Sequence, residues 1–456
     1  MRTGCFSVSH DDCGKEFNLM KKLLRAMAAL ALAVLICSLC NVAACFVNTP
    51  RMNENAAQAV QMLMWQGSQP EVVGGFPSAR LDNFTAVLMI KTAAYTGPES
   101  LLVRAFGGMR TELQAEEGED DWEAFCTIAD GSESPSGGLS YLRYWHGYIL
   151  PLRLLLCLLN FSNIQMLLLF VQTALLVLVA LQIVRRKLSM ILPGFIVAYF
   201  FMMPAAMGIC VQYVSVALLT LSACAVLLCL NERIDRAIGL PGFFSLVGLL
   251  TNYFDLLTFP LVTLGFPLVL CVCLDLRSKG GRGAFRVNGL WRTVSLAVAC
   301  SAAWAAGYAG MWMMKWLLAA VFFGPMWVAS IAGQMRLRVS SASNGEHFSR
   351  LDVVRRNMHV LTDRASYLLI GAMTAISLLA SAVHKTLRER AMGRTLRVDI
   401  RVIALLIPAA LPFLWILVMA NHSFDHWYYT FRILSCTVFA LCALPAFAVQ
   451  SEKTGE

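Results

Sequence analysis

The feature that most constrains this chain is a series of long apolar runs separated by short polar segments. A helix of about 20 apolar residues crosses the roughly 30 Å hydrocarbon layer of a bilayer. The composition agrees, because 58% of the residues are hydrophobic and only 14% are charged, unlike a soluble domain. Since lipid offers the backbone no hydrogen-bond partners, such runs fold as helices, and the alternating pattern of barrel strands is absent. We predict an all-α, polytopic transmembrane helical bundle with about ten spans, at residues 23–47, 164–184, 188–209, 211–230, 237–250, 258–274, 291–310, 367–383, 402–419 and 431–449.

The lysines and arginines indicate how this bundle is oriented. Cytoplasmic segments of membrane proteins are rich in Lys and Arg, and short loops carry most of this information. With a cytoplasmic amino end, 22 of the 37 Lys and Arg residues lie inside, and only Arg432 borders a short outside turn. We therefore expect a multi-pass protein of the cell membrane with both termini cytoplasmic, and the net charge of +9 requires no nucleic-acid partner. The expected parts are a cytoplasmic tail (1–22), a first transmembrane helix (23–47), an extracytoplasmic loop (48–163), six core helices (164–310), an extracytoplasmic or interfacial segment (311–366), three core helices (367–449) and a cytoplasmic tail (450–456).

Three segments have a second interpretation. Residues 316–332 are apolar enough to span, but we expect them to be interfacial or re-entrant, because the basic cluster at 385–401 then stays inside. The first run is expected to be an uncleaved signal anchor, although small residues before Cys45 also resemble a lipoprotein cleavage box. The run at 237–250 is short and rich in glycine around Pro241, which predicts a broken helix.

The loop at 48–163 is the only sizeable segment expected outside the bilayer. Residues 84–95 and 144–159 have amphipathic helical patterns and predict helices that lie on the membrane surface. In the second of these, Arg153 is expected to extend its charged end toward water. Two further stretches have the composition of solvated segments, namely an acidic run at 112–123 and a Gly, Ser and Pro-rich linker at 131–138.

Polar and aromatic side chains gather at the outside ends of the predicted helices. Asp255 and Asp425 border spans, where ionisable groups are costly and tend to be functional. His422 and His426 are four residues apart and share a helical face, a pairing that suits proton, phosphate or metal binding, but no third ligand has suitable spacing, so we predict no metal site. Structural anchoring at the membrane interface is the competing interpretation of each cluster. The clusters lie at 80–83, 143–146, 252–255, 308–315 and 421–432.

This layout resembles the GT-C class of membrane glycosyltransferases. The stretches Tyr-Trp-His-Gly-Tyr at 144–148, Thr-Asn-Tyr-Phe-Asp at 251–255 and Asn-His-Ser at 421–423 are similar to those of uncharacterised bacterial multipass membrane proteins. GT-C enzymes transfer a sugar from a polyprenyl-phosphate carrier outside the cytoplasm, and their first outside loop supplies a carboxylate. The resemblance implies that role for Asp82, although Asp82 lies well beyond the first helix and has no adjacent acidic residue.

A site for glycosyl transfer requires particular kinds of side chain. It needs a carboxylate base and positive charge for the departing lipid phosphate. The partners implied are a polyprenyl-phosphate-linked sugar donor, an envelope acceptor and membrane lipid, while the sequence leaves any cofactor open. A transporter or flippase for a lipid-linked or anionic substrate, or a non-catalytic subunit of an envelope-assembly complex, are the alternatives. The expected catalytic residues are Asp82 and Asp255, and the expected substrate-binding residues are Arg143, His146, Lys315, His422, Asp425, His426 and Arg432.

Overall fold

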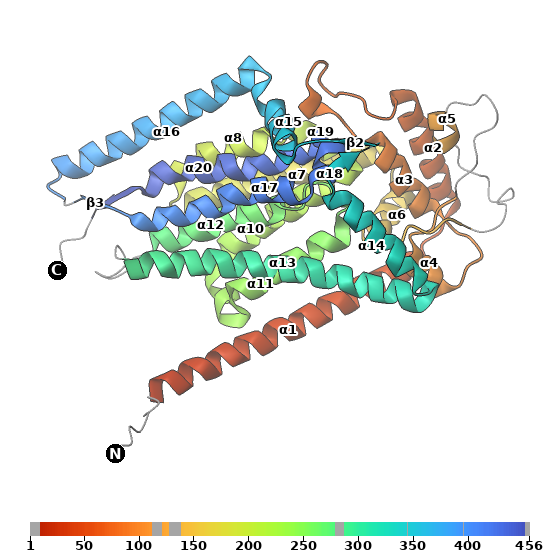
Figure 1. The fold of residues 1–456 in the computed structure, drawn as a ribbon, viewed down its shortest axis with the longest axis horizontal. Helices are drawn as coiled ribbons and strands as arrows, with labels where there is room; N and C mark the ends of the chain where they lie inside the picture. Colours follow the sequence, from red (N-terminus) through yellow and green to blue (C-terminus); the bar gives the residue numbers. More distant parts are fainter. Residues whose placement is uncertain are drawn as a thin grey trace.

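The computed structural model describes residues 10–111, 121–126, 138–278, 287–343, 345–394 and 396–451. Its long helices run in roughly the same direction and form a bundle (Figure 1). Most of the acidic run (112–120) and of the linker (131–137), and both chain ends (1–9 and 452–456), lie outside the described residues.

The two ends of the bundle differ in what they contain. The start of α1 (His10–Ala44) lies at one end with the paired strands β3 (Leu396–Val398) and β4 (Val449–Ser451); we call this the termini end (Figure 1). The opposite, loop end collects the segments between the spans. These are α2 (Pro50–Gln66), η1 (Pro77–Ala79), α3 (Asn83–Ala94), α4 (Leu101–Gly107), α5 (Asp121–Cys126), α6 (Ile149–Leu158), α14 (Met326–Val339), β1 (Ala342–Ser343), β2 (Glu346–His347), α15 (Arg350–Thr362) and α18 (Ala420–Asp425).

Seven helical stretches within the described residues are long and apolar enough to cross a membrane. This confirms a predominantly helical chain with helices suited to a bilayer, while the full count of ten spans stays a prediction. The seven are Phe17–Ala44 of α1, α7 (Phe161–Arg185), α10 (Val211–Ala237), α13 (Val287–Phe323), α16 (Ala365–Ala391), η3 (Ile400–Leu405) with α17 (Leu406–Val418), and α19 (Trp427–Thr430) with η4 (Phe431–Leu434) and α20 (Ser435–Phe447).

A broken helix is present, but not where the sequence predicted it. The expected break near Pro241 is wrong, because α11 (Gly239–Phe254) is continuous and Pro241 sits in its first turn, where no backbone N–H is needed. The predicted span at 188–209 is the broken one. It forms η2 (Ser189–Ile191), α8 (Leu192–Phe200) and α9 (Pro204–Ile209), with Met203 in the left-handed region at φ +59°.

The ambiguous segment at 316–332 belongs to two helices. α13 has 37 residues, which makes it about 55 Å long and longer than a bilayer is thick. It ends at Phe323, and Gly324, at φ +98°, lets the chain turn back into α14. The segment is therefore not one continuous spanning helix.

Close packing of α11 on α13 depends on two glycines. A Cβ atom on Gly248 would overlap the carbonyl of Trp304, and one on Gly307 would overlap the carbonyl of Ser245. Small residues at such crossings let two backbones approach, which is how membrane helices gain packing contacts. This crossing holds α11 so that its C-terminal end, followed by Asp255, reaches the loop end.

The helix predicted at 84–95 exists, but it is not a surface helix. It is α3, and Asp82 is its N-cap residue. Every side chain from Ala86 to Ala93 is buried, between α2, α6 and neighbouring helices. The predicted position on the membrane surface is therefore wrong: α3 is a core helix of the loop end.

Arg153 of α6 is also buried rather than extended toward water. Its guanidinium donates hydrogen bonds to the carbonyl oxygens of Ala44 (2.6 Å), Val47 (3.2 Å), Ala93 (2.6 Å) and Tyr95 (2.6 Å). These carbonyls are at the C-terminal ends of α1 and α3, where a cation interacts favourably with the helix dipole. Arg153 thus joins the first span to the loop end.

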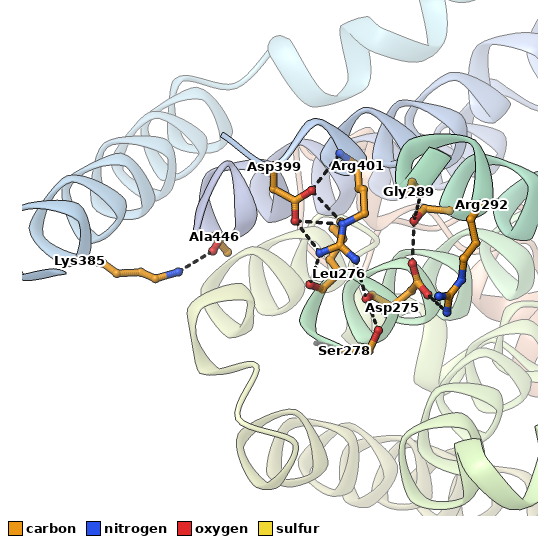
Figure 2. A network of polar contacts seen from close by, with 10 residues as sticks. Asp275, Leu276, Ser278, Gly289, Arg292, Lys385, Asp399, Arg401 and Ala446 are labelled. Atoms are coloured by element: carbon orange, nitrogen blue, oxygen red, sulfur yellow. Dashed lines mark hydrogen bonds and ion pairs between the residues drawn. The ribbon is translucent and has the colours of Figure 1, made fainter. Parts of the chain in front are cut away.

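A second polar network closes the termini end (Figure 2). Arg401 donates to the Asp399 carboxylate (2.7 Å) and to the carbonyls of Asp275 and Leu276 at the C-terminal end of α12 (Val262–Arg277). The Asp275 carboxylate in turn accepts hydrogen bonds from Thr293 (2.7 Å) and Arg292 of α13. These contacts link α12, α13 and η3, far from the loop end.

Candidate functional site

The two predicted catalytic carboxylates share one local motif. In Asp82-x-x-Thr85 and in Asp255-x-x-Thr258, the carboxylate accepts hydrogen bonds from the backbone N–H and the hydroxyl of the threonine. The hydroxyl contacts are 2.9 Å for Asp82 and 2.5 Å for Asp255. Burial raises the pKa of the Asp255 carboxyl to about 6, although the bonds from Thr258 oppose that rise.

Asp82 is buried among the helices of the loop end. The Tyr428 hydroxyl donates to its carboxylate over 3.4 Å, and the Gln212 side chain is a further hydrogen-bond partner. Burial raises the pKa of Asp82 despite these bonds and those from Thr85. The carboxylate therefore connects α3 with α10 and α19.

The histidine pair predicted from spacing is present. The ring centroids of His422 and His426 are 4.9 Å apart, and His426 stacks on Tyr429 at 5.2 Å. Nε2 of His426 lies 3.2 Å from a guanidinium nitrogen of Arg338. Burial lowers the pKa of His426 to about 4 and that of His422 well below its usual range, so both rings are neutral at pH 7. No group of three potential metal ligands occurs among the described residues.

His422 links this pair to Asp255. Its ring lies beside the backbone of Leu257 and Thr258, and Thr258 is the residue that holds the Asp255 carboxylate. Leu257 itself is in the left-handed region at φ +65°, a conformation that costs energy for a bulky side chain. Asp425 points elsewhere and accepts a hydrogen bond from Ser343 of β1 (2.6 Å).

A small pocket lies where these elements meet. It combines two arginines, Arg143 and Arg338, with the indole rings of Trp312 and Trp316. Arg143 donates to Gln334 of α14 over 3.1 Å. The indole N–H groups of both tryptophans are buried and have no hydrogen-bond acceptor within the described part of the chain. The complete lining is Arg143, Tyr144, Leu257, Trp312, Trp316, Ile331, Gln334, Met335 and Arg338.

An aromatic ladder leads along α13 to this pocket. Trp304, Tyr308, Trp312 and Trp316 follow one another at four-residue spacing, with ring centroids 5.0, 5.3 and 5.9 Å apart. Such spacing places the rings on one face of a helix. Aromatic faces with unpaired N–H donors beside arginines can bind a sugar ring and its attached phosphate.

An apolar pocket of about 360 Å³ lies next to this polar region. It is bounded mainly by α6, α7 and α10, with Tyr148 and Phe254 at its border. Phe254, the last residue of α11, lines this pocket and directly precedes Asp255 in the chain. The size and apolar walls of the pocket suit a hydrocarbon chain.

Two of the predicted substrate-binding residues, Arg432 and Lys315, are cations that hold the fold in this structure. Each nitrogen of the buried Arg432 guanidinium donates to a backbone carbonyl, of Met202, Tyr428 or Ser78. Lys315 is buried and donates to the carbonyl of Phe106. These internal contacts occupy the donors of both side chains. Arg432 in particular donates to the carbonyl of Met202, beside the break between α8 and α9.

His146 is likewise committed to internal contacts. Nδ1 lies 3.0 Å from the Tyr148 hydroxyl, and Nε2 lies 2.8 Å from the carbonyl of Tyr141. Burial and the nearby Lys315 lower the pKa of His146 to about 3. The residue is neutral and positions the loop that carries Arg143.

Sequence reasoning missed several residues of the site. Arg338, Gln334 and Trp316 were not selected, because α14 has a polar, basic end whose contacts with Arg143 and His426 are distant in sequence. The available signal was the four-residue aromatic spacing along α13, which ends at Trp316.

No family model, curated protein or solved structure matches this chain in the three comparisons made.

Proposed function

We propose that this protein is a membrane glycosyltransferase that uses a polyprenyl-phosphate sugar donor and an extracytoplasmic acceptor. The observation that supports it most is the proximity of three features at the loop end. These are a buried carboxylate of raised pKa, a pocket with two arginines and two tryptophans, and an apolar pocket for a chain. A lipid-linked phosphosugar has a chemical counterpart for each, although the pocket between the arginines and tryptophans is about 10 Å³ here and must widen to admit it.

In this proposal, Asp255 is the base and Asp82 organises the site. Attack of a hydroxyl on the anomeric carbon requires removal of its proton, and a base works best when its pKa is near the working pH. Asp255 lies two residues from Leu257 in the pocket wall, whereas Asp82 is separated from that pocket by Tyr428, Tyr429 and His426. The acceptor proton moves to Asp255, and the donor lipid phosphate leaves.

Arg143 and Arg338 are the proposed partners of the leaving phosphate. A guanidinium binds phosphate through two parallel hydrogen bonds and keeps its charge at any working pH. Their present partners, Gln334 and His426, are neutral, so neither arginine gives up an ion pair to bind an anion. The sugar stacks on Trp312 or Trp316, and the chain occupies the apolar pocket.

A transporter for the same lipid is the second candidate, and the broken helix favours it. Transporters place discontinuous helices at their substrate sites. Here the break at Met203 adjoins the buried Arg432, whose guanidinium stacks over Tyr213 at 4.5 Å.

One experiment separates the two candidates. The purified protein in lipid vesicles is given a labelled polyprenyl-phosphate sugar and an extract of envelope acceptors, and both lipid-phosphate release and donor translocation are followed. A glycosyltransferase releases the lipid phosphate. Translocation of intact donor, with no release, would support the transporter instead.

A further inference from the structure

We propose that α16 carries a binding site for an anionic phospholipid at the termini end of the bundle. This site is independent of glycosyl transfer, because α16 runs to the termini end, whereas Asp255 follows α11 at the loop end (Figure 1). The proposal rests on one polar stripe of α16, defined by Ser377, Ser381, His384 and Arg388.

The stripe is a single exposed face of a membrane-spanning helix. Its four residues are separated by four, three and four positions, the spacing that aligns side chains along one side of a helix. All four side chains are exposed, and they line a shallow hollow of about 480 Å³ together with Ala380, Lys385 and Glu389. A hydroxyl-bearing face toward lipid is costly unless something hydrogen-bonds to it.

The order of side chains along the stripe matches the parts of a phospholipid. Arg388 and His384 lie near the basic end of α16, at the depth of a headgroup phosphate, and Ser381 and Ser377 lie one and two turns deeper. Further along, Met373 and Ile376 are exposed and apolar, as acyl chains require. The phosphate thus meets the Arg388 guanidinium and the His384 imidazole, the glycerol esters meet hydroxyls, and the chains meet apolar surface.

The charges around the stripe favour an anion. Glu389 forms an ion pair with Arg394 (2.8 Å), so its carboxylate is compensated. Lys385 donates to the carbonyl of Ala446 in α20, a contact that leaves its positive charge in place (Figure 2). A second copy of this chain is a poor occupant, because a two-fold symmetric pair through this face would set Arg388 against Arg388.

The test uses the full-length protein and fluorescent phosphatidylglycerol in phosphatidylcholine nanodiscs. We expect Arg388→Ala to weaken phosphatidylglycerol binding about fivefold, the usual effect of one basic residue at an anionic headgroup. Ser381→Leu should also weaken it, although no charge changes. Arg185→Ala, which removes an exposed charge from α7, is the control and should leave binding unchanged.

Three results would overturn the proposal. Equal losses in Arg388→Ala and Arg185→Ala would mean unspecific surface charge. Competition by inorganic phosphate as effective as that by unlabelled phosphatidylglycerol would mean a site for a free anion. Self-association in pure phosphatidylcholine that Ser381→Leu abolishes would mean that a second copy covers the stripe.

Discussion

Nη1 of Arg338 lies 3.2 Å from Nε2 of His426, and this contact joins α14 to the turn that follows α18. A guanidinium only donates hydrogen bonds, so the imidazole must be neutral to accept one. Burial and Arg338 itself lower the pKa of His426 to about 4, which keeps the ring neutral. The contact therefore depends on pH.

Acid should weaken the fold through His426. Its pKa is about 6.5 when unfolded and about 4 when folded, so between these values the unfolded chain binds more protons and stability falls as pH falls. Asp255, whose pKa is raised, has the opposite effect and adds stability as the pH falls below about 6. This contribution is the same in the wild type and in any variant that retains Asp255. We expect His426→Asn to show a smaller drop in melting temperature from pH 7 to pH 4 than the wild type. An identical drop in both proteins would contradict a neutral, buried His426.

Replacing Arg153 by Met should strongly destabilise the protein. The change leaves the carbonyls of Ala93 and Tyr95 without their donor, while the Ala44 carbonyl keeps a hydrogen bond from the N–H of Val47. Each buried acceptor without a partner costs about 1 to 3 kcal/mol. The measurement is the melting temperature of detergent-solubilised protein by fluorescence-detected size exclusion, with Arg185→Met as the control. A melting temperature equal to that control would show that Arg153 is not a structural link.

The α11–α13 crossing can be tested with two glycines of one helix. Gly307→Ala places a Cβ against the carbonyl of Ser245, whereas a Cβ on Gly310 meets open space. Overpacking typically costs about 1 to 3 kcal/mol, while Gly310→Ala should be neutral or slightly stabilising, because alanine favours helix. Thermal melting of both variants provides the comparison. If Gly310→Ala is the more damaging, the packing described for α11 and α13 is wrong.

Much of the fold could be predicted from the sequence because it depends on local patterns. Apolar runs determine the helices, and Asp82 before the 83–94 segment indicates a cap. The break at Met203 and the burial of Arg153 could not be predicted, since both depend on carbonyls and cations that are distant in sequence. For the site, spacing predicted the histidine pair, but Arg338 required knowledge of how α14 folds back.

The orientation of the bundle can be measured by thiol labelling. A suitable probe is a cysteine at Glu346, which is exposed on β2 at the loop end. On a background without the exposed Cys229, a membrane-impermeant maleimide added to intact cells should label Glu346→Cys. A cysteine at Arg185, near the basic turn after α7, should react only after the cells are opened. The reverse pattern would place the loop end in the cytoplasm.

The most direct test of the proposed function is release of lipid phosphate by Asp255→Asn. The amide keeps the size of the side chain but cannot accept the proton, so turnover should fall by about 10² to 10⁴ while donor binding changes little. Asp352→Asn, at an exposed carboxylate of α15, should release lipid phosphate at the wild-type rate. Wild-type release should also decline as the pH falls below about 6, where Asp255 becomes protonated. Full activity of a folded Asp255→Asn variant, with the same pH profile as the wild type, would remove this carboxylate from the reaction and contradict the proposal.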